Sequence, residues 1–272
     1  MKRKVVIITD LDGSLLHPVT YSFKEAAQAL DLIKKLGIPL ILSSSKTRAE
    51  IELYKNRLGN TDPFVSENGG GIFIPKDYFP FDIEGTETGN YTVINIGTPY
   101  VDVRNVFKQI NTELGANAVG FGDLTVNEIA KITNMTQEEA SLSKKREFDE
   151  PFLLNGNNEE KEVFIKTIKE KGYSWTEGRF LHILGAHDKG KAANTLKEFY
   201  KKENGHILSI GIGDSLNDIP LLEEVDYPIL IPKESGNYIE ASSLDNLIKA
   251  EFAGPKGWDM AVRKVLKNIG GI

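Results

Sequence analysis

Two carboxylates lie directly after the first apolar segment of the chain. Residues 5–9 are apolar or β-branched, and Asp10, Asp12 and Gly13 follow them. Because side chains alternate along an extended strand, Asp10 and Asp12 lie on the same side of the backbone. Two carboxylates at a buried strand end repel each other and lose hydration, and a hard divalent cation such as Mg²⁺ relieves both penalties. Asp is also a common turn former after a strand, which is the alternative interpretation.

Two further polar segments follow strand-like segments elsewhere in the chain. Ser44 comes after residues 38–42, and Asp214 comes after residues 206–211. In an open α/β sheet the ligand lies beyond the carboxyl ends of the strands. We therefore expect these two residues and the two carboxylates of the first segment to meet in one crevice, although they are far apart in the sequence.

These residue types suit phosphoryl transfer to a carboxylate nucleophile. We expect Asp10 to attack phosphorus and form an aspartyl-phosphate, which water then hydrolyses. Asp12 protonates the leaving oxygen as general acid and later activates water as general base. A divalent cation held by Asp10, Asp12 and Asp214 removes the repulsion between carboxylate and phosphate. The Lys189 ammonium and the Ser44 hydroxyl bind the phosphoryl oxygens, although a solvated lysine and a polar loop are the ordinary alternatives.

Alternating strand and helix patterns predict the fold class. Apolar strands near residues 4–9 and 38–42 are each followed by a helical pattern, which indicates a parallel α/β sheet. Several helix starts are marked by Ser or Thr three residues before Glu, the spacing of a capping box. These pairs are Ser22/Glu25, Thr47/Glu50, Thr125/Glu128 and Thr136/Glu139.

The pattern changes to polar residues and glycine near residues 82–85, and the parallel pattern resumes at Asp188. A strand at 91–96 is expected to lie within the intervening insert. We therefore expect an α/β fold with a Rossmann-like parallel sheet core, helices on both faces, and an inserted α+β cap domain. The expected division is a first core part at 1–83, the cap at 84–185 and a second core part at 186–272.

Composition limits the partners and the location. With 272 residues and a formal net charge of −6, the chain is not suited to nucleic acid or an anionic membrane surface as its main partner. The absence of cysteine excludes disulfides, thiolate nucleophiles and Cys-ligated zinc. The sequence has no membrane-spanning apolar run and enters its first strand without a signal-type segment, so we expect a cytoplasmic protein. Nothing in the sequence indicates its oligomeric state.

Four segments together resemble the haloacid dehalogenase superfamily of phosphatases. Residues 10–14, Ser44, Lys189 and residues 213–218 match its four motifs in order. The insert between the second and third motifs resembles the α+β cap of the branch that contains sucrose-phosphate phosphatase and phosphomannomutase. The resemblance implies a Mg²⁺ cofactor and catalysis by Asp10, Asp12, Ser44 and Lys189. The expected phosphate-binding residues are Ser44, Ser45, Lys189 and Asn217, supported by Ser215 and Asp218.

Further segments narrow the resemblance to the mannosyl-3-phosphoglycerate phosphatases. They are residues 44–50, 66–69, 73–81 and 146–152. This resemblance implies hydrolysis of mannosyl-3-phosphoglycerate to phosphate and mannosylglycerate, a compatible solute.

Such a substrate carries a phosphate, a glycerate carboxylate and a sugar. The expected substrate-binding residues are Lys46, Thr47, Arg48, Glu67, Asn68 and Arg146. Arg48 is expected to bind the carboxylate, because guanidinium groups form two parallel hydrogen bonds with carboxylates, and Arg146 approaches it from the cap. Glu67 and Asn68 offer acceptors and donors to sugar hydroxyls. A solvated charge or a helix-end partner is the alternative at each position.

Three other functions remain open at this point. The same chemistry suits glucosyl-3-phosphoglycerate or another sugar phosphate, because mannose and glucose differ by one hydroxyl orientation. A sugar phosphomutase uses the same aspartyl-phosphate. A non-catalytic sugar-phosphate binding module has no need of both Asp10 and Asp12.

Overall fold

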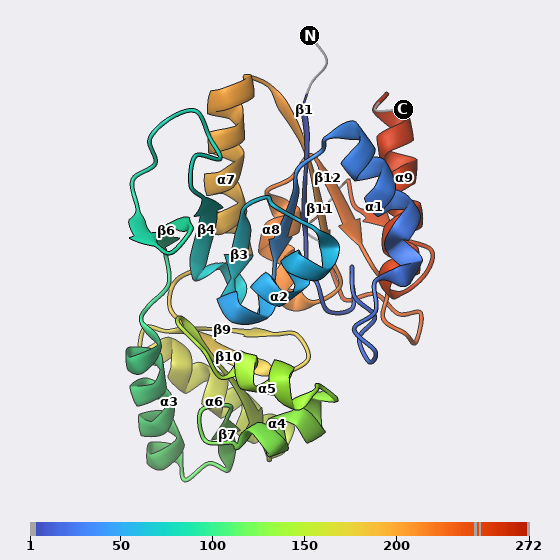
Figure 1. Ribbon diagram of the computed structural model, residues 1–272. Coiled ribbons are helices and arrows are strands. Elements are labelled where there is room, and N and C mark those ends of the chain that lie inside the picture. The colour runs from blue at the N-terminus through green and yellow to red at the C-terminus, as the bar shows by residue number, and fades with distance from the viewer. Residues whose placement is uncertain (1–3, 242–243, 245, 271–272) are drawn as a thin grey trace.

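The computed structural model describes residues 4–241, 244 and 246–270, and its strands form two sheets (Figure 1). The larger sheet has nine strands in the order β13-β12-β11-β1-β2-β3-β4-β6-β5. Their bounds are β1 Lys4–Thr9, β2 Leu40–Ser43, β3 Phe64–Ser66, β4 Gly71–Pro75, β5 Thr86–Thr88, β6 Tyr91–Asn95, β11 Ile207–Gly213, β12 Tyr227–Leu230 and β13 Ile248–Lys249. All pairings from β13 to β3 are parallel, and those from β3 to β5 are antiparallel.

Helices cover both faces of the large sheet. They are η1 Lys24–Ala26, α1 Ala27–Leu36, α2 Arg48–Leu58, η2 Glu67–Gly69, α7 Lys189–Asn204, η3 Leu216–Asp218, α8 Ile219–Glu223 and α9 Gly254–Asn268. Alternate side chains of β1 point to opposite faces of the large sheet. Ile7 packs in the cluster that includes Trp258 of α9, whereas Ile8 packs in the cluster that includes Leu196 of α7. This two-sided burial explains the almost continuous apolar sequence of β1 and confirms the α/β class.

The smaller sheet is antiparallel and has the order β7-β8-β10-β9. Its elements are α3 Tyr100–Leu114, β7 Ala118–Gly120, α4 Val126–Thr133, α5 Gln137–Ser143, β8 Asp149–Leu154, α6 Asn158–Glu170, β9 Ser174–Glu177 and β10 Leu181–Leu184. Phe107, Phe152 and Phe164 centre an apolar cluster of its own. Figure 1 shows this unit against the end of the large sheet that lies away from the N-terminus, where β1 ends.

The strands β5 and β6 fall within the expected insert at 84–185 but belong to the large sheet. In that sheet β6 pairs with β4, and β5 extends the edge. Gly89 has a φ of 58° and turns the chain back between the two strands. The Tyr91 ring packs edge-on against Phe64 and Phe73, with centroids 5.4 and 6.0 Å away. The polar residues at 82–85 therefore mark a loop within the large unit, not the passage out of it.

Three of the four predicted capping boxes form. Thr47, Thr125 and Thr136 each accept a hydrogen bond from the backbone of the Glu three residues later. The box predicted at Ser22 does not form, because a 3-10 turn comes before α1 and Ser22 instead accepts from the backbone of Lys24 at 3.3 Å. Among the described residues, no helix has the length and apolar character needed to cross a membrane.

Candidate active site

Lys189 joins two buried carboxylates at the carboxyl ends of β1 and β11. Its side chain is fully buried at the start of α7, and its Nζ lies 2.6 Å from Asp10 Oδ1 and 2.6 Å from Asp218 Oδ1. Asp188 caps the helix by accepting from the backbone of Lys191. Asp218 Oδ2 accepts from the backbone of Asp214 at 2.9 Å, so Asp218 connects the lysine to the loop after β11. The structure thus brings the first, third and fourth predicted motifs together.

The end of β1 is fixed by contacts on its other side. The Asp10 backbone N–H donates to the Ile212 carbonyl at 2.9 Å, and the Thr9 hydroxyl donates to the Asp10 carbonyl at 2.8 Å. The buried indole N–H of Trp258 donates to the Thr9 hydroxyl at 2.9 Å. Helix α9 therefore helps to hold the backbone that presents Asp10.

The carboxylate oxygens of Asp10, Asp214 and Asp218 lie within 4.8 Å of one another and are buried. Burial and the nearby Asp218 raise the pKa of Asp214, and burial raises the pKa of Asp10 despite Lys189. Close carboxylates that resist ionisation fit a hard divalent cation, which would compensate their charge. Gly13 has a φ of 85°, and a Cβ there would lie 2.5 Å from Asp214 Oδ2, so this approach requires glycine.

The predicted metal ligands were Asp10, Asp12 and Asp214, but Asp12 is not part of this carboxylate cluster. Asp12 Oδ2 pairs with Lys46 Nζ at 2.8 Å, and Asp12 Oδ1 is buried without a hydrogen bond to any described residue. Lys46 is buried with its Nζ 5.0 Å from the centroid of the Tyr21 ring and 5.5 Å from that of Tyr54. Burial lowers the pKa of Lys46, but the carboxylates of Asp12 and Glu50 outweigh it and raise the pKa above its ordinary value. Lys46 is thus a partner of Asp12 in this structure, and its predicted contact with a substrate carboxylate stays a prediction.

A cavity of about 490 Å³ opens onto Asp10 and Asp12. Its lining residues include Ser45, Asp214, Ser215, Asn217, Gly178, Arg179 and Lys233. Ser44 is buried beside it at the end of β2. Arg179 and Lys233 were not predicted, because neither stands in a recognisable motif. Arg179 reaches the cavity from the β9–β10 turn of the small sheet, and Lys233 Nζ lies 2.6 Å from Asp214 Oδ2.

Thr47 and Arg48, predicted to bind substrate, have other contacts. The Thr47 hydroxyl caps α2 and donates to the Leu142 carbonyl at 3.0 Å. Arg48 lies 3.3 Å from a carboxylate oxygen of Glu147 and stacks over the Phe73 ring at 5.6 Å. Neither lines the cavity at Asp10. The helix start points both side chains toward the small unit, which the spacing of residues could not reveal.

Glu67 and Arg146 are also committed to internal contacts. Glu67 is fully buried, and its carboxylate accepts from the backbone N–H groups of Glu147, Phe148 and Asp149 at 2.8–3.0 Å. Arg146 Nε lies 3.4 Å from Glu67 Oε2, and Arg146 also pairs with Asp149. The predicted contact of Glu67 with sugar hydroxyls is therefore replaced by a contact that fastens the chain entering β8 to the large unit.

A buried histidine beside this contact predicts acid sensitivity. His187 is 2% exposed, and its Nε2 lies 3.2 Å from the Glu67 carbonyl. Burial lowers the pKa of His187 from 6.5 to about 4, so the folded state binds fewer protons than the unfolded state between these values. Stability from this group is present above pH 6.5 and is lost as the pH falls toward 4.

The variant His187→Gln keeps a donor for the Glu67 carbonyl and cannot be protonated. Between pH 7 and pH 5 its free energy of unfolding should fall by about 2 kcal/mol less than that of the wild type. Urea unfolding at the two pH values measures the difference. The exposed His206→Gln is the matched control and should follow the wild type. An equal acid loss in wild type and His187→Gln would contradict the assignment.

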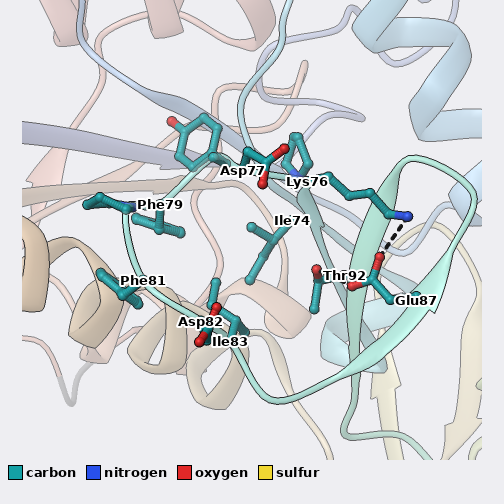
Figure 2. Close-up of a pocket in the computed structure, with 12 residues that line it drawn as sticks. Ile74, Lys76, Asp77, Phe79, Phe81, Asp82, Ile83, Glu87 and Thr92 are labelled. Carbon is teal, nitrogen blue, oxygen red and sulfur yellow. Dashed lines mark hydrogen bonds and ion pairs between the residues drawn. The ribbon is translucent and has the colours of Figure 1, made fainter.

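A second cavity, of about 520 Å³, lies away from these groups (Figure 2). Residues 74–83 form most of its wall, and an ion pair of Lys76 with Glu87 at 2.8 Å spans one side. It contains none of the predicted catalytic or binding residues. Its floor is made by Phe79 and Phe81, which pack with α7, so the aromatic segment 73–81 has a structural role at this face.

The match to known proteins agrees with this geometry. Residues 7–242 match the family model of haloacid dehalogenase-like hydrolases. The chain belongs to this family of hydrolases.

Curated relatives match most of the chain. The glucosyl-3-phosphoglycerate/mannosyl-3-phosphoglycerate phosphatase of Methanococcoides burtonii is 43% identical over 265 residues, which cover 97% of each chain. The mannosyl-3-phosphoglycerate phosphatase of Pyrococcus horikoshii is 39% identical over 227 residues, or 83% of this chain and 90% of the relative.

A solved structure supports the fold. A haloalkanoate-superfamily phosphatase from Bacteroides thetaiotaomicron aligns with a TM-score of 0.68 at 18% identity, covering 100% of this chain and 97% of its own.

Proposed function

We propose that the protein is a phosphatase that hydrolyses a glycosyl-3-phosphoglycerate, with mannosyl-3-phosphoglycerate as the first candidate and glucosyl-3-phosphoglycerate as the second. The observation that carries the mechanism is the buried contact of Lys189 Nζ with Asp10 Oδ1, 2.6 Å apart, at a carboxylate that lines the cavity. The names of the relatives from M. burtonii and P. horikoshii support the substrate. The M. burtonii enzyme is named for both sugars, which keeps glucose as an alternative.

Asp10 is the nucleophile in this proposal. Its carboxylate attacks phosphorus and the bond from phosphorus to the glycerate oxygen breaks, which leaves an aspartyl-phosphate. The Lys189 ammonium offsets the charge of Asp10 and of the phosphoryl oxygens, and Ser44 and Asn217 donate to those oxygens. Asp10 and Asp214 are the residues of the carboxylate cluster that would hold Mg²⁺, because both oxygens of Asp218 already accept from Lys189 and from the Asp214 backbone. The cation would supply charge neutralisation between carboxylate and phosphate when bound.

Asp12 is proposed to transfer protons in both steps. It donates a proton to the departing glycerate oxygen, and the resulting carboxylate then takes a proton from the water that hydrolyses the aspartyl-phosphate. Lys46 Nζ lies 2.8 Å from Asp12 Oδ2 and holds this carboxyl group in place at the cavity.

We propose that the small sheet and its helices form a cap over this site, entered after β6 and left before Lys189. Gly178 and Arg179 of the cap line the same cavity as Asp10 and Asp12. The sugar and glycerate of the substrate would occupy this cavity, where Arg179 and Lys233 offer positive charge to the carboxylate. A closed cap would keep other phosphoryl acceptors away from the aspartyl-phosphate, so that only water admitted to the site can react with it.

The test is phosphate release with Mg²⁺ from a panel of esters. It contains mannosyl- and glucosyl-3-phosphoglycerate, sucrose 6-phosphate, mannose 6-phosphate and free 3-phosphoglycerate. A kcat/KM that is high only for the two glycosyl-phosphoglycerates is the expected result, and their ratio identifies the sugar. Even activity over simple sugar phosphates would contradict the substrate, and transfer of phosphate between sugar hydroxyls without release would indicate a mutase. Chelator-treated enzyme is the blank.

A further inference from the structure

The segment that follows β3 has a constrained backbone. Glu67, Asn68 and Gly69 have φ angles of 47°, 58° and 100°, in the left-handed region that residues other than glycine rarely adopt. A Cβ on Gly69 would lie 2.1 Å from the Asp188 carbonyl oxygen, so the segment is pressed against the start of α7. Such a conformation persists only where the surroundings fix it, and the contacts of the two side chains show what it serves.

The side chain of Asn68 connects the small sheet to the catalytic loop. Its Nδ2 donates to Asp149 Oδ2, at the start of β8, at 2.8 Å. Its Oδ1 accepts from Asn217 Nδ2 at 3.0 Å. All three side chains are buried, with Asn68 2% and Asn217 7% exposed. Asn217 also lines the cavity that contains Asp10.

The carboxylate of Asp149 determines the direction of these hydrogen bonds. Asp149 pairs with the Arg146 guanidinium, and a carboxylate in such a pair accepts hydrogen bonds and donates none. His182 Nδ1 lies 3.0 Å from Asp149 Oδ2, and burial lowers the pKa of His182 to about 3, so a neutral imidazole donates there as well. The amino group of Asn68 must therefore face Asp149, which leaves its oxygen to face Asn217.

We propose that Asn68 is a positioning residue that fixes which end of the Asn217 amide faces the catalytic cavity, with the cap carboxylate Asp149 as the acceptor that sets the direction. One amino hydrogen of Asn217 is held by Asn68, and the second is directed to a phosphoryl oxygen. A reversed Asn217 would place two amide oxygens against each other and an acceptor against an anion. The inference rests on the proposed function, because it assigns the cavity to a phosphoryl group.

The variant Asn68→Gly tests the role with little backbone penalty. Glycine accepts the left-handed conformation, so the change removes the amide and keeps the turn. The turnover number kcat should fall about tenfold, and KM should change by less than about threefold in either direction. A misplaced donor reduces the stabilisation of the transition state more than it reduces substrate binding. Asn217→Ala should lower kcat about a hundredfold. In the double variant, Asn68→Gly should add no further loss.

The matched control is Asp77→Gly. Asp77 is also a non-glycine residue with a left-handed φ, 59°, and it lies at the second cavity of Figure 2, away from the catalytic groups. Its replacement should leave kcat unchanged. If Asn68→Gly lowers kcat by the same factor with and without Asn217, the two residues are not coupled and the proposal is overturned.

A second measurement does not depend on turnover. In protein labelled with ¹⁵N-asparagine, the side-chain amide signals of Asn217 are assigned as those missing in Asn217→Ala. They should exchange slowly with water in the wild type and at least about tenfold faster in Asn68→Gly and in Asp149→Asn. Unchanged exchange in both variants would overturn the proposal even in a folded, active enzyme. Failure of the substrate panel alone would reject the proposed function and leave this result standing.

Discussion

Asp10→Asn should fold normally and release phosphate at least about a thousandfold more slowly than the wild type. The amide has the shape of the carboxylate but cannot attack phosphorus, so no aspartyl-phosphate forms. Its oxygen can still accept from Lys189, which keeps the contact that fixes the lysine. Burial first, and then the charges of Asp218 and Asp214, raise the pKa of Asp10 in the wild type, and an uncharged amide avoids both penalties. The thermal unfolding midpoint should therefore stay close to that of the wild type.

Phosphate release on the best substrate and thermal unfolding together check this prediction. Asp82→Asn is the matched control, because Asp82 is exposed and lines the second cavity, whose lining includes none of the reacting groups. It should retain wild-type turnover. A thousandfold loss leaves about 0.1% of wild-type activity. If Asp10→Asn instead retains more than about 5%, Asp10 is not the nucleophile.

Much of the fold was predictable because its signals are local. β1 and β2 are largely apolar on both faces, and each is followed directly by a polar residue of the site, Asp10 or Ser44. The capping boxes at Thr47, Thr125 and Thr136 depend on residues three apart, and all three form. The residues that form such features lie within one helix turn or one strand of each other, so a short stretch of sequence contains both partners.

The edge of the large sheet was misassigned for the opposite reason. β6 joins the sheet through its pairing with β4, and β5 through its pairing with β6. Nothing in the strand pattern of residues 91–95 distinguishes an edge strand of one sheet from a strand of another. The choice is made by the packing of Tyr91 on Phe64 and Phe73, which no local pattern encodes.

The identity of the polar residues was predictable at the site, but their partners were not. Lys46, Glu67 and Arg146 were expected to meet the substrate, yet each is buried with a partner from the chain itself. A buried charge needs a counter-charge or several donors, and these come from segments about 80 residues away for Glu67. Arg179 was missed because its place at the cavity follows from how the small unit sits on the large one.

Lys189→Met should abolish turnover and also destabilise the protein, which separates it from Asp10→Asn. The lysine is fully buried between Asp10 and Asp218, at 2.6 Å from each. Removing one member of a buried ion pair leaves the other charge without compensation, at a cost of about 3–5 kcal/mol. Turnover should fall at least about a thousandfold, since the phosphoryl oxygens and the nucleophile lose the same cation.

The destabilisation should depend on pH in a definite direction. Burial already raises the pKa of Asp10 and Lys189 lowers it, so without the ammonium the pKa of Asp10 rises further above that of the unfolded chain, and the folded state holds a proton that the unfolded state releases. Stability is then lost as the pH rises, and the difference from wild type in metal-free urea unfolding should be larger at pH 8 than at pH 5.5. Lys191→Met is the matched control on the same helix turn. Lys191 is half-exposed and pairs with Asp188 at 3.5 Å, so its loss should cost less than about 1 kcal/mol at either pH. Equal stability of the two variants would mean that Lys189 does not compensate the buried carboxylates, and the charge balance proposed for the nucleophile would be wrong.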